Sequence, residues 1–305
     1  MTLTATPAPA VPASPPPRPG RTGLMPRLLS RTAVNGVLVI ATLYTLMPLL
    51  WLVMASTKDM RDLFGTNGFA FGQEFNLGAN LSHLFTANDG IYLEWLWNTV
   101  LYAGGGALVA TALCVAAGYA FDKLAFPFKE KIFGLILLGV LVPASAMALP
   151  IYLLASKVGL VNTFWGFFLP SLVFPFGVYL ARVFSAAYVP DEVVEATRVD
   201  GAGDLRTFVS IGFPMLRTAF VTIFLFQFTS IWNGFYLPLV MLTDQHLYPL
   251  NLGLYTWQTT GLNQGHPEDY LLAITGSLVA VIPLIIAFVA LQRYWKAGMT
   301  TGAVK

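Results

Sequence analysis

Residues 187–217 read AYVPDEVVEATRVDGAGDLRTFVSIGFPMLR and form a charged stretch between two long apolar runs. Pro190 suits the first turn of a helix, and the acidic residues after it favour the N-terminal half of that helix through its dipole. Gly201 stands just past the expected end of the helix, where a positive φ angle costs glycine little. A second short helix is expected over about residues 204–211, ending before Pro214. The apolar face that this loop is expected to offer to a partner consists of Val193, Val194, Phe208 and Ile211.

The apolar runs around this loop predict the fold class. The sequence is 56% apolar and only 10% charged over its 305 residues, whereas a soluble domain carries roughly 25% charged residues. Six uncharged stretches are each long enough for a membrane-spanning helix of about 20 residues. Helix is the expected form because backbone in hydrocarbon must satisfy its hydrogen bonds internally. The sequence therefore predicts an all-α, polytopic membrane protein whose six transmembrane helices cover residues 33–55, 95–121, 132–156, 158–181, 218–243 and 270–292.

Both ends of the chain differ from this transmembrane domain, which is expected over residues 33–292. Residues 1–32 are dense in proline and then basic. Such a composition cannot form a packed core, so a disordered tail is expected there. Residues 293–305 are expected to form a second, short tail after the last span.

The basic residues set the expected orientation of the chain. With the N-terminus in the cytoplasm, the cytoplasmic segments contain all of the 17 lysines and arginines except Lys58, Arg61 and Lys157. Cytoplasmic loops carry the excess of Lys and Arg in membrane proteins. Both termini and the 187–217 loop are therefore expected to be cytoplasmic. The outer segments are expected to be 56–94 and 244–269.

The six stretches contain no Asp, Glu or His. Ion-driven carriers usually place ionisable groups at membrane depth, where they form the proton relay or the ion site. Their absence disfavours a proton-coupled carrier and indicates that energy enters from outside the membrane. A passive channel, or a sodium site built from carbonyl groups, remains open.

The sequence also limits the chemistry of the chain itself. It contains no Gly-x-x-x-x-Gly-Lys-Ser/Thr loop that would cradle phosphates. Cys114 is the only cysteine, so an intrachain disulfide and a cysteine metal cluster are excluded. The net charge of +2 gives no indication of nucleic-acid binding. We therefore expect a chain that is not an enzyme and that binds no metal or cofactor.

Polar and small residues inside the spans have two interpretations each. Residues 227–236 mix amides and hydroxyls with aromatic rings, and neutral sugars are bound by such a mixture. The alternative is hydrogen bonding between neighbouring membrane helices. The run Ala-Gly-Gly-Gly-Ala at 103–107 predicts close helix packing. The candidate residues of a substrate pathway are Gln227, Trp232, Asn233 and Tyr236.

The 187–217 stretch resembles the EAA loop of bacterial ABC importer permeases. The family pattern is Glu-Ala-Ala, two residues, Asp-Gly-Ala, and a proline further on. Here Thr197 stands in place of the third residue of the pattern, and the remaining spacing fits. The resemblance implies that the first helix docks in a cleft on an ATPase subunit and transmits its closure to the spans. The residues that it assigns to this coupling are Glu195, Ala196, Asp200, Gly201, Ala202 and Pro214.

Further segments look like the carbohydrate-uptake branch of these permeases, which is related to the maltose system. They are Pro-Ile-Tyr-Leu at 150–153, Gly-Leu-Val-Asn-Thr at 159–163, Trp-Asn at 232–233 and the ending GMTTGAVK at 298–305. The ending is similar to that of the second of the two permease types, whose tail reaches between the ATPases. The resemblance therefore implies tail contacts through Gly302 and Lys305.

Taken together, the resemblance implies a permease subunit of an ATP-driven importer for a sugar or oligosaccharide in the bacterial cytoplasmic (inner) membrane. The implied partners are a second permease subunit, a dimer of ATPase subunits that bind ATP and Mg, an extracytoplasmic solute-binding protein and the membrane lipids. Two alternatives remain open at this point. One is an ABC permease for another solute, such as glycerol phosphate or a polyamine, and the other is an ion-coupled secondary carrier or a channel.

Overall fold

The computed structural model describes residues 24–300, which form helices and turns without a strand in that range. The chain divides into two compact units, residues 1–48 and 49–305. The smaller unit contains most of α1 (Leu24–Ser56), whose side chains are exposed over 32–48. Helix α1 covers the expected span 33–55 but begins earlier, so part of the expected N-terminal tail is helical. The reason lies in its first residues, which are good helix formers, with Pro26 in the first turn where a missing N–H is tolerated.

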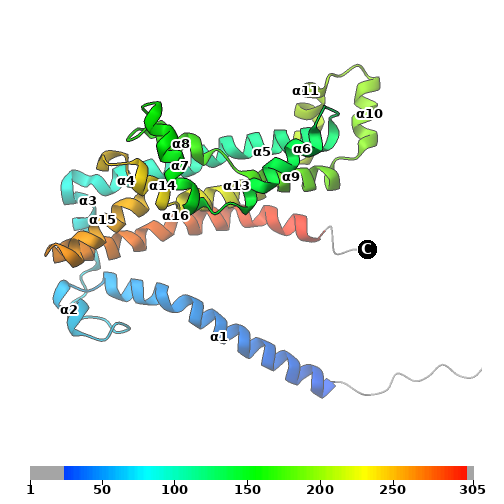
Figure 1. The fold of residues 1–305 in the computed structure, drawn as a ribbon. Helices are drawn as coiled ribbons and strands as arrows, with labels where there is room; N and C mark the ends of the chain where they lie inside the picture. Colours follow the sequence, from blue (N-terminus) through cyan, green and yellow to red (C-terminus); the bar gives the residue numbers. More distant parts are fainter. Residues whose placement is uncertain (1–23, 301–305) are drawn as a thin grey trace, which may run out of the picture. The chain divides into compact units, whose positions relative to one another are not determined.

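The larger unit contains all the remaining elements (Figure 1). In chain order they are α2 (Met60–Gly65), α3 (Leu77–Thr86), η1 (Ala87–Gly90), α4 (Ile91–Thr99), η2 (Val100–Gly105), α5 (Gly106–Lys123), α6 (Lys129–Leu141), α7 (Ala144–Lys157), α8 (Phe164–Ser171), α9 (Pro175–Tyr188), α10 (Asp191–Val199), α11 (Asp204–Thr207), η3 (Phe208–Gly212), α12 (Phe213–Met215), α13 (Arg217–Trp232), α14 (Tyr236–Met241), η4 (Gln245–Leu247), α15 (Leu250–Asn263) and α16 (Pro267–Thr300).

The expected spans are helical, but three of them are interrupted. Span 132–156 consists of α6 and α7, which are bent by 108° at a break before Pro143. Span 158–181 begins with turns, and its helices α8 and α9 continue to Tyr188. Span 218–243 is broken after Trp232, where α13 ends. Among the described residues, four helices are long and apolar enough to cross a membrane, or up to six if each bent pair is one crossing.

Helix α5 lies at the centre of the larger unit and packs against α9 and α13. The contact with α9 is close, because a Cβ added at Gly118 would clash with the Cβ of Ala181. At the other end of α5, a Cβ on Gly106 would lie 3.1 Å from Cδ1 of Ile231 on α13. Within the run of small residues at 103–107, close packing is therefore confirmed at Gly106, whereas a Cβ added at Gly104 would meet nothing within 4 Å.

Helix α4 and η2 bind the segment that leads into α15, and we name this arrangement the α4 clasp. Its hydrogen bonds run from Trp95 Nε1 to the Gln245 carbonyl (2.8 Å), from Asn98 Nδ2 to the His246 and Tyr248 carbonyls (2.7 and 3.2 Å), from Tyr102 Oη to the Leu247 carbonyl (3.2 Å) and from the Leu250 N–H to Thr99 Oγ1 (2.6 Å). The His246 ring also lies 2.7 Å from the Glu94 carboxylate, and this hydrogen bond raises the pKa of His246 above 6.5.

Candidate functional site

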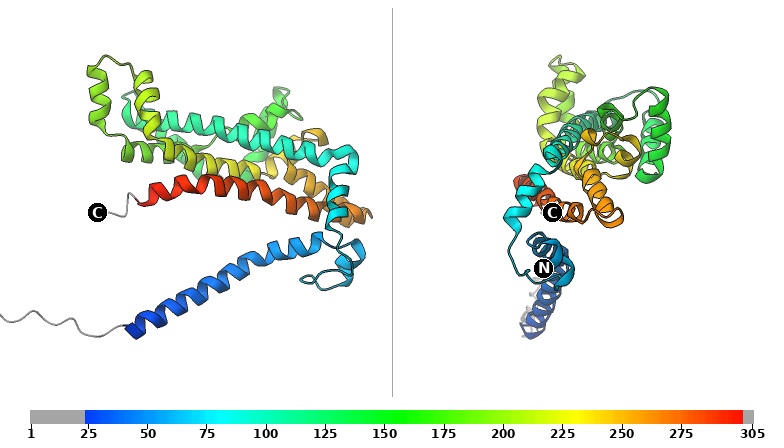
Figure 2. Two further views of the ribbon diagram at one scale, coloured as in Figure 1. Left: turned by 180° about the vertical axis from the view of Figure 1, so that it is seen from behind. Right: turned by 90° about the vertical axis from the view of Figure 1, so that its left-hand side faces the viewer.

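The loop at 187–217 projects from the end of the helices that lies opposite α15 (Figure 2). Its first helix is α10, as predicted, and a glycine turn follows it. The N–H groups of Gly201 and Ala202 donate to the carbonyls of Arg198 and Thr197, at 3.0 and 2.9 Å. These two bonds form a Schellman motif, which requires a left-handed residue past the helix end. Gly201 supplies it, with a φ angle of +79°.

The second half of the loop is helical for longer than predicted. Helix α11 continues through the π-helical segment η3 into α12, so the helix does not end before Pro214. Pro214 therefore lies inside a continuous helical segment, directly after the π-helical residues of η3. The helical direction changes instead after Met215, where the segments 204–215 and 217–232 are bent by 77°.

Two of the four apolar residues expected to face a partner, Val194 and Phe208, pack against the spans instead, whereas Val193 and Ile211 are half-buried. Val194 is buried in a cluster with Val115 and Ala181 of the spans. Phe208 packs there as well, with its ring centroid 5.0 Å from that of Tyr119. The loop therefore packs on α5 and α9 through Val194 and Phe208, and these two residues are not free to form a partner face.

Other apolar side chains of the same loop are exposed. Val199 is 88% exposed, Leu205 is 77% exposed and Val209 is 58% exposed. The sequence did not single out these three residues, because exposed and buried apolar residues of the loop follow one another at the same intervals along the chain. The motif residues Glu195, Ala196, Asp200 and Gly201 are exposed on the same loop, whereas Ala202 and Pro214 are partly buried.

Thr197, the departure from the family pattern, joins the two helices of the loop. Its hydroxyl donates to the Val194 carbonyl at 2.7 Å and lies 3.1 Å from the hydroxyl of Thr207. Because the Thr197 proton is used on the carbonyl, Thr207 must be the donor between the two hydroxyls. Thr207 is buried on α11, so this bond fixes the distance between α10 and α11.

Lys123, at the C-terminal end of α5, holds the start of α10. Its Nζ lies 2.6 Å from the Asp191 carboxylate and 3.1 Å from that of Asp122, which also accepts a 2.7 Å bond from Ser185 of α9. We name these four residues the α5 latch. The Lys123 side chain is only 5% exposed and Asp191 is 77% exposed. The hydrogen bond from Lys123 lowers the pKa of Asp191.

Tyr119 lies beneath the loop and is a further residue that sequence reasoning missed. It is buried, and its hydroxyl has no hydrogen-bond partner among the described residues. A Cβ added at Gly212 would lie 2.7 Å from Cε2 of the Tyr119 ring. The glycine therefore makes room for the ring at the point where η3 crosses α5.

The four candidate pathway residues divide into two pairs. Gln227 and Trp232 are buried, and Gln227 Nε2 donates to the Ser171 carbonyl at 2.6 Å. Their geometry matches the alternative of hydrogen bonding and packing between helices. Asn233 and Tyr236 are exposed, and Asn233 Nδ2 donates to the Thr229 carbonyl within its own helix.

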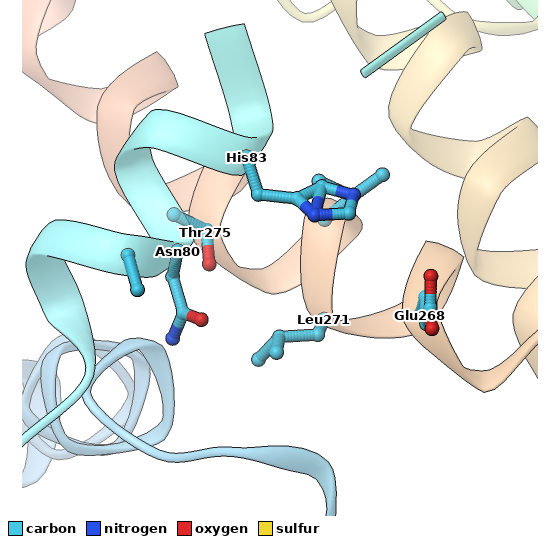
Figure 3. Close-up of a pocket in the computed structure, with 7 residues that line it drawn as sticks. Asn80, His83, Glu268, Leu271 and Thr275 are labelled. Carbon is cyan, nitrogen blue, oxygen red and sulfur yellow. The ribbon is translucent and has the colours of Figure 1, made fainter. Parts of the chain in front are cut away.

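A small pocket of about 210 Å³ lies between α3 and the start of α16 (Figure 3). Asn80 and His83 line it from α3, and Glu268, Leu271 and Thr275 line it from α16. The Thr275 hydroxyl is buried and lacks a hydrogen-bond partner within the described part of the chain. Because buried hydroxyls normally find a partner, a water molecule is expected there. The volume lies below the roughly 300–1,000 Å³ of small-molecule sites, so we assign this pocket no ligand.

Two further expectations concern the ends of the chain and metal binding. Gly302 and Lys305, the expected tail contacts, lie outside the described residues, as do 1–23 of the expected N-terminal tail. Residues 293–300, expected to be tail, continue helix α16. Between residues 24 and 300, His, Cys, Asp and Glu side chains form no group of three or more that could hold a metal ion.

Comparison with known proteins places this loop in a family context. Residues 115–301 match the model of the family described as "binding-protein-dependent transport system inner membrane component". The chain is 31% identical to the arabinooligosaccharides transport system permease protein AraQ of Halalkalibacterium halodurans over 260 residues, which cover 85% of this chain and 90% of that protein. It is 28% identical to the lactose transport system permease protein LacG of Rhizobium radiobacter, with 88% and 94% of the two chains covered.

The fold is also similar to that of a solved structure. The match is a chain in the crystal structure of a bacterial ABC transporter involved in the import of the acidic polysaccharide alginate. The TM-score is 0.75 with 22% sequence identity, over 92% of this chain and 99% of the other. Since the family model covers more than half of the sequence and the AraQ relative nearly all of it, the chain belongs to the family of inner-membrane components of binding-protein-dependent transport systems.

Proposed function

We propose that this chain is the permease subunit of an ATP-driven (ABC) importer and that the 187–217 loop couples it to the ATPases. The observation that carries the proposal is that the loop both packs on the spans and exposes apolar side chains. It packs on the spans through Val194 and Phe208. Val199, Leu205 and Val209 of the same loop are exposed, as is the motif residue Glu195. Exposed apolar side chains in one place mark an interaction surface.

The connections between the loop and the spans can transmit movement from one to the other. The loop is continuous in sequence with α9 and α13, and the α5 latch joins it to a third helix. Closure of the ATPase subunits would move α10, and these three connections would carry the motion into the spans. The coupling residues are Glu195, Ala196, Asp200, Gly201, Ala202 and Pro214, with Gly201 setting the angle between α10 and α11.

The substrate is proposed to be a sugar or oligosaccharide. The relatives named above are described as permeases for arabinooligosaccharides and for lactose, and another, MelC of Bacillus subtilis, as an import permease for melibiose, raffinose and stachyose. The proposed assembly adds a second permease subunit, two ATPase subunits that bind ATP and Mg, and an extracytoplasmic solute-binding protein. The proposed location is the bacterial cytoplasmic membrane, with both termini inside.

The turn at Gly201 supplies the experiment that tests coupling. A valine at position 201 must adopt the φ angle of +79°, which costs a β-branched residue about 1–3 kcal/mol. We expect Gly201→Val to insert and assemble normally but to separate ATP hydrolysis from uptake. The measurement is ATP-driven sugar uptake and ATPase activity of the reconstituted importer.

Gly203 provides the matched control. It lies in the same turn with a φ angle of −73°, and a Cβ added there meets nothing within 4 Å. Gly203→Val should therefore leave uptake and its coupling unchanged. Normal ATP-coupled uptake by Gly201→Val would show that the loop does not have the proposed coupling role. Uptake without ATP would contradict the proposal that the protein is part of an ABC importer.

A further inference from the structure

A second pocket, of about 490 Å³, lies where α15 and α16 meet the C-terminal part of α1 and the segment before α14. This part of α1 belongs to the larger unit. The volume falls within the range of about 300–1,000 Å³ that is typical of small-molecule sites. Its aromatic and amide side chains are Trp51, Phe235, Asn251, Tyr255, Gln258 and Tyr270.

Aromatic rings form the walls of this pocket, and neighbouring rings fix their orientation. The Tyr255 ring stands edge-on to Phe235, with centroids 4.8 Å apart and an interplanar angle of 70°. The Tyr270 ring stacks on Phe64, with centroids 5.9 Å apart. Rings held by such contacts lose little conformational freedom when a ligand binds. The C–H faces of a sugar ring pack well against rigid aromatic surfaces of this kind.

The polar groups of the pocket are neutral and include both donors and acceptors. Asn251 Nδ2 donates to the Trp232 carbonyl at 2.9 Å, which orients the amide and leaves its oxygen as an acceptor. The side chains of Tyr255 and Gln258 add a hydroxyl and an amide to the lining. The residues that line the pocket include no Asp, Glu, Lys, Arg or His. A ligand recognised here would be uncharged and would carry several hydroxyl groups.

We propose that this pocket binds one sugar unit of a neutral oligosaccharide, on the face that the charge distribution assigns to the exterior. The inference rests on the proposed function, and it deepens that function by giving this subunit its own carbohydrate site. The proposal also changes which residues are expected to contact the substrate. They lie on α15 and α16, whereas Gln227 and Trp232 make contacts between helices.

The buried state of Cys114 makes a direct test possible. Cys114 is the only cysteine in the sequence and is 2% exposed, so a cysteine introduced at the surface reacts selectively with a maleimide. The test variant is Gln258→Cys, at the pocket, in the full chain held in lipid nanodiscs. The probes are raffinose, lactose and arabinotriose, with glycine betaine as a solute that is not a carbohydrate.

We expect at least one of the three sugars, but not glycine betaine, to slow the labelling of Gln258→Cys. The matched control is Gln264→Cys, which is exposed just after α15 and does not line the pocket. Its labelling should be unaffected by any of the four solutes. Equal protection at both positions, or no protection by any sugar, would overturn the proposal.

A second pair of variants tests the aromatic wall. Tyr255 and Tyr179 are 41% and 40% exposed, but only Tyr255 lines the pocket. In the Gln258→Cys background, Tyr255→Ala should raise the sugar concentration for half-maximal protection about tenfold, the effect of losing one aromatic contact. Tyr179→Ala should leave it unchanged, and equal effects of the two substitutions would contradict the assignment.

Uptake by the reconstituted importer separates this proposal from the proposed function. If ATP-driven sugar uptake is present but the pocket is not protected, the pocket assignment alone fails. If protection occurs without ATP-driven uptake, the importer assignment fails and the sugar site remains. If labelling of Gln258→Cys is blocked by the second permease subunit and not by sugar, the pocket is a contact between subunits and the proposal is wrong.

Discussion

Thr197 illustrates what a single residue contributes beyond the motif around it. Its hydroxyl connects α10 to Thr207 of α11, a contact that the alanine of the family pattern does not make. The sequence predicted the glycine turn at Gly201, because its chemistry depends on residues next to one another. It did not predict the partner of Thr197, because that contact depends on how two helices cross.

Tyr119 provides a prediction at the same scale. Its buried hydroxyl has no partner in the described part of the chain, and an unsatisfied buried polar group is unfavourable. Tyr119→Phe should therefore leave stability unchanged or increase it by about 1 kcal/mol. Tyr119→Ala removes the ring that packs on Phe208 and should destabilise the protein by roughly 3–5 kcal/mol.

Thermal unfolding of the purified chain in detergent, followed by circular dichroism, measures both variants. A loss of stability in Tyr119→Phe comparable to that in Tyr119→Ala would show that the hydroxyl has a partner after all. It would also contradict the inference that the Tyr119 ring holds the loop on the spans by packing and not by hydrogen bonding.

At the scale of elements, α10 is held from two directions. Val194 packs its inner side against the spans, and the α5 latch ties its first turn to Lys123. Hydrophobic periodicity predicted that these segments are helical. It could not predict the latch, because Lys123 and Asp191 read in sequence as ordinary loop charges and become partners only when α5 packs beside α9.

Substitutions at the two ends of the α5 latch, Lys123 and Asp191, are expected to destabilise α10 to different extents. Lys123→Met leaves the partly buried Asp122 without its cation and should cost roughly 1–3 kcal/mol. Asp191→Asn removes the exposed end, and exposed ion pairs contribute little. Hydrogen exchange of the α10 backbone should therefore increase strongly in Lys123→Met and only slightly in Asp191→Asn. Equal effects would contradict the buried role of Lys123.

The latch also has a defined pH dependence. The pKa of Asp191 is lowered from 3.8 by Lys123, so the stabilisation from this pair is fully present above pH 3.8 and is lost as the pH falls through the lowered pKa. Exchange of the α10 amides, corrected for intrinsic rates, should therefore show no loss of this contact between about pH 5 and pH 8.

At the scale of the whole molecule, the sequence predicted where the apolar helices lie better than where they break. The stretches at 33–55 and 270–292 each lie within one helix. The stretch at 132–156 turns by 108° before Pro143, and hydropathy cannot distinguish such a bend from a straight crossing. The number of crossings therefore depends on how the two bent pairs sit in the bilayer.

Orientation is the prediction that belongs to this scale. With Cys114 buried, Gly203→Cys and Gln264→Cys each introduce one reactive thiol on the two sides of α13. A membrane-impermeant maleimide should label Gln264→Cys in intact cells and Gly203→Cys only in inside-out vesicles. The reverse pattern would contradict the cytoplasmic loop, and labelling of both from one face would remove α13 as a membrane crossing.

The α4 clasp has a consequence for the order in which contacts form during synthesis. The hydrogen bond from Trp95 to Gln245 joins residues 150 positions apart in the sequence, and the other bonds of the clasp are of similar range. During synthesis, α4 emerges long before its partners, and contacts across such distances form late because chain closure must come first. The clasp is thus completed only after residues 245–250 have been inserted, so a chain interrupted before η4 would expose an unpaired α4 to quality-control proteases.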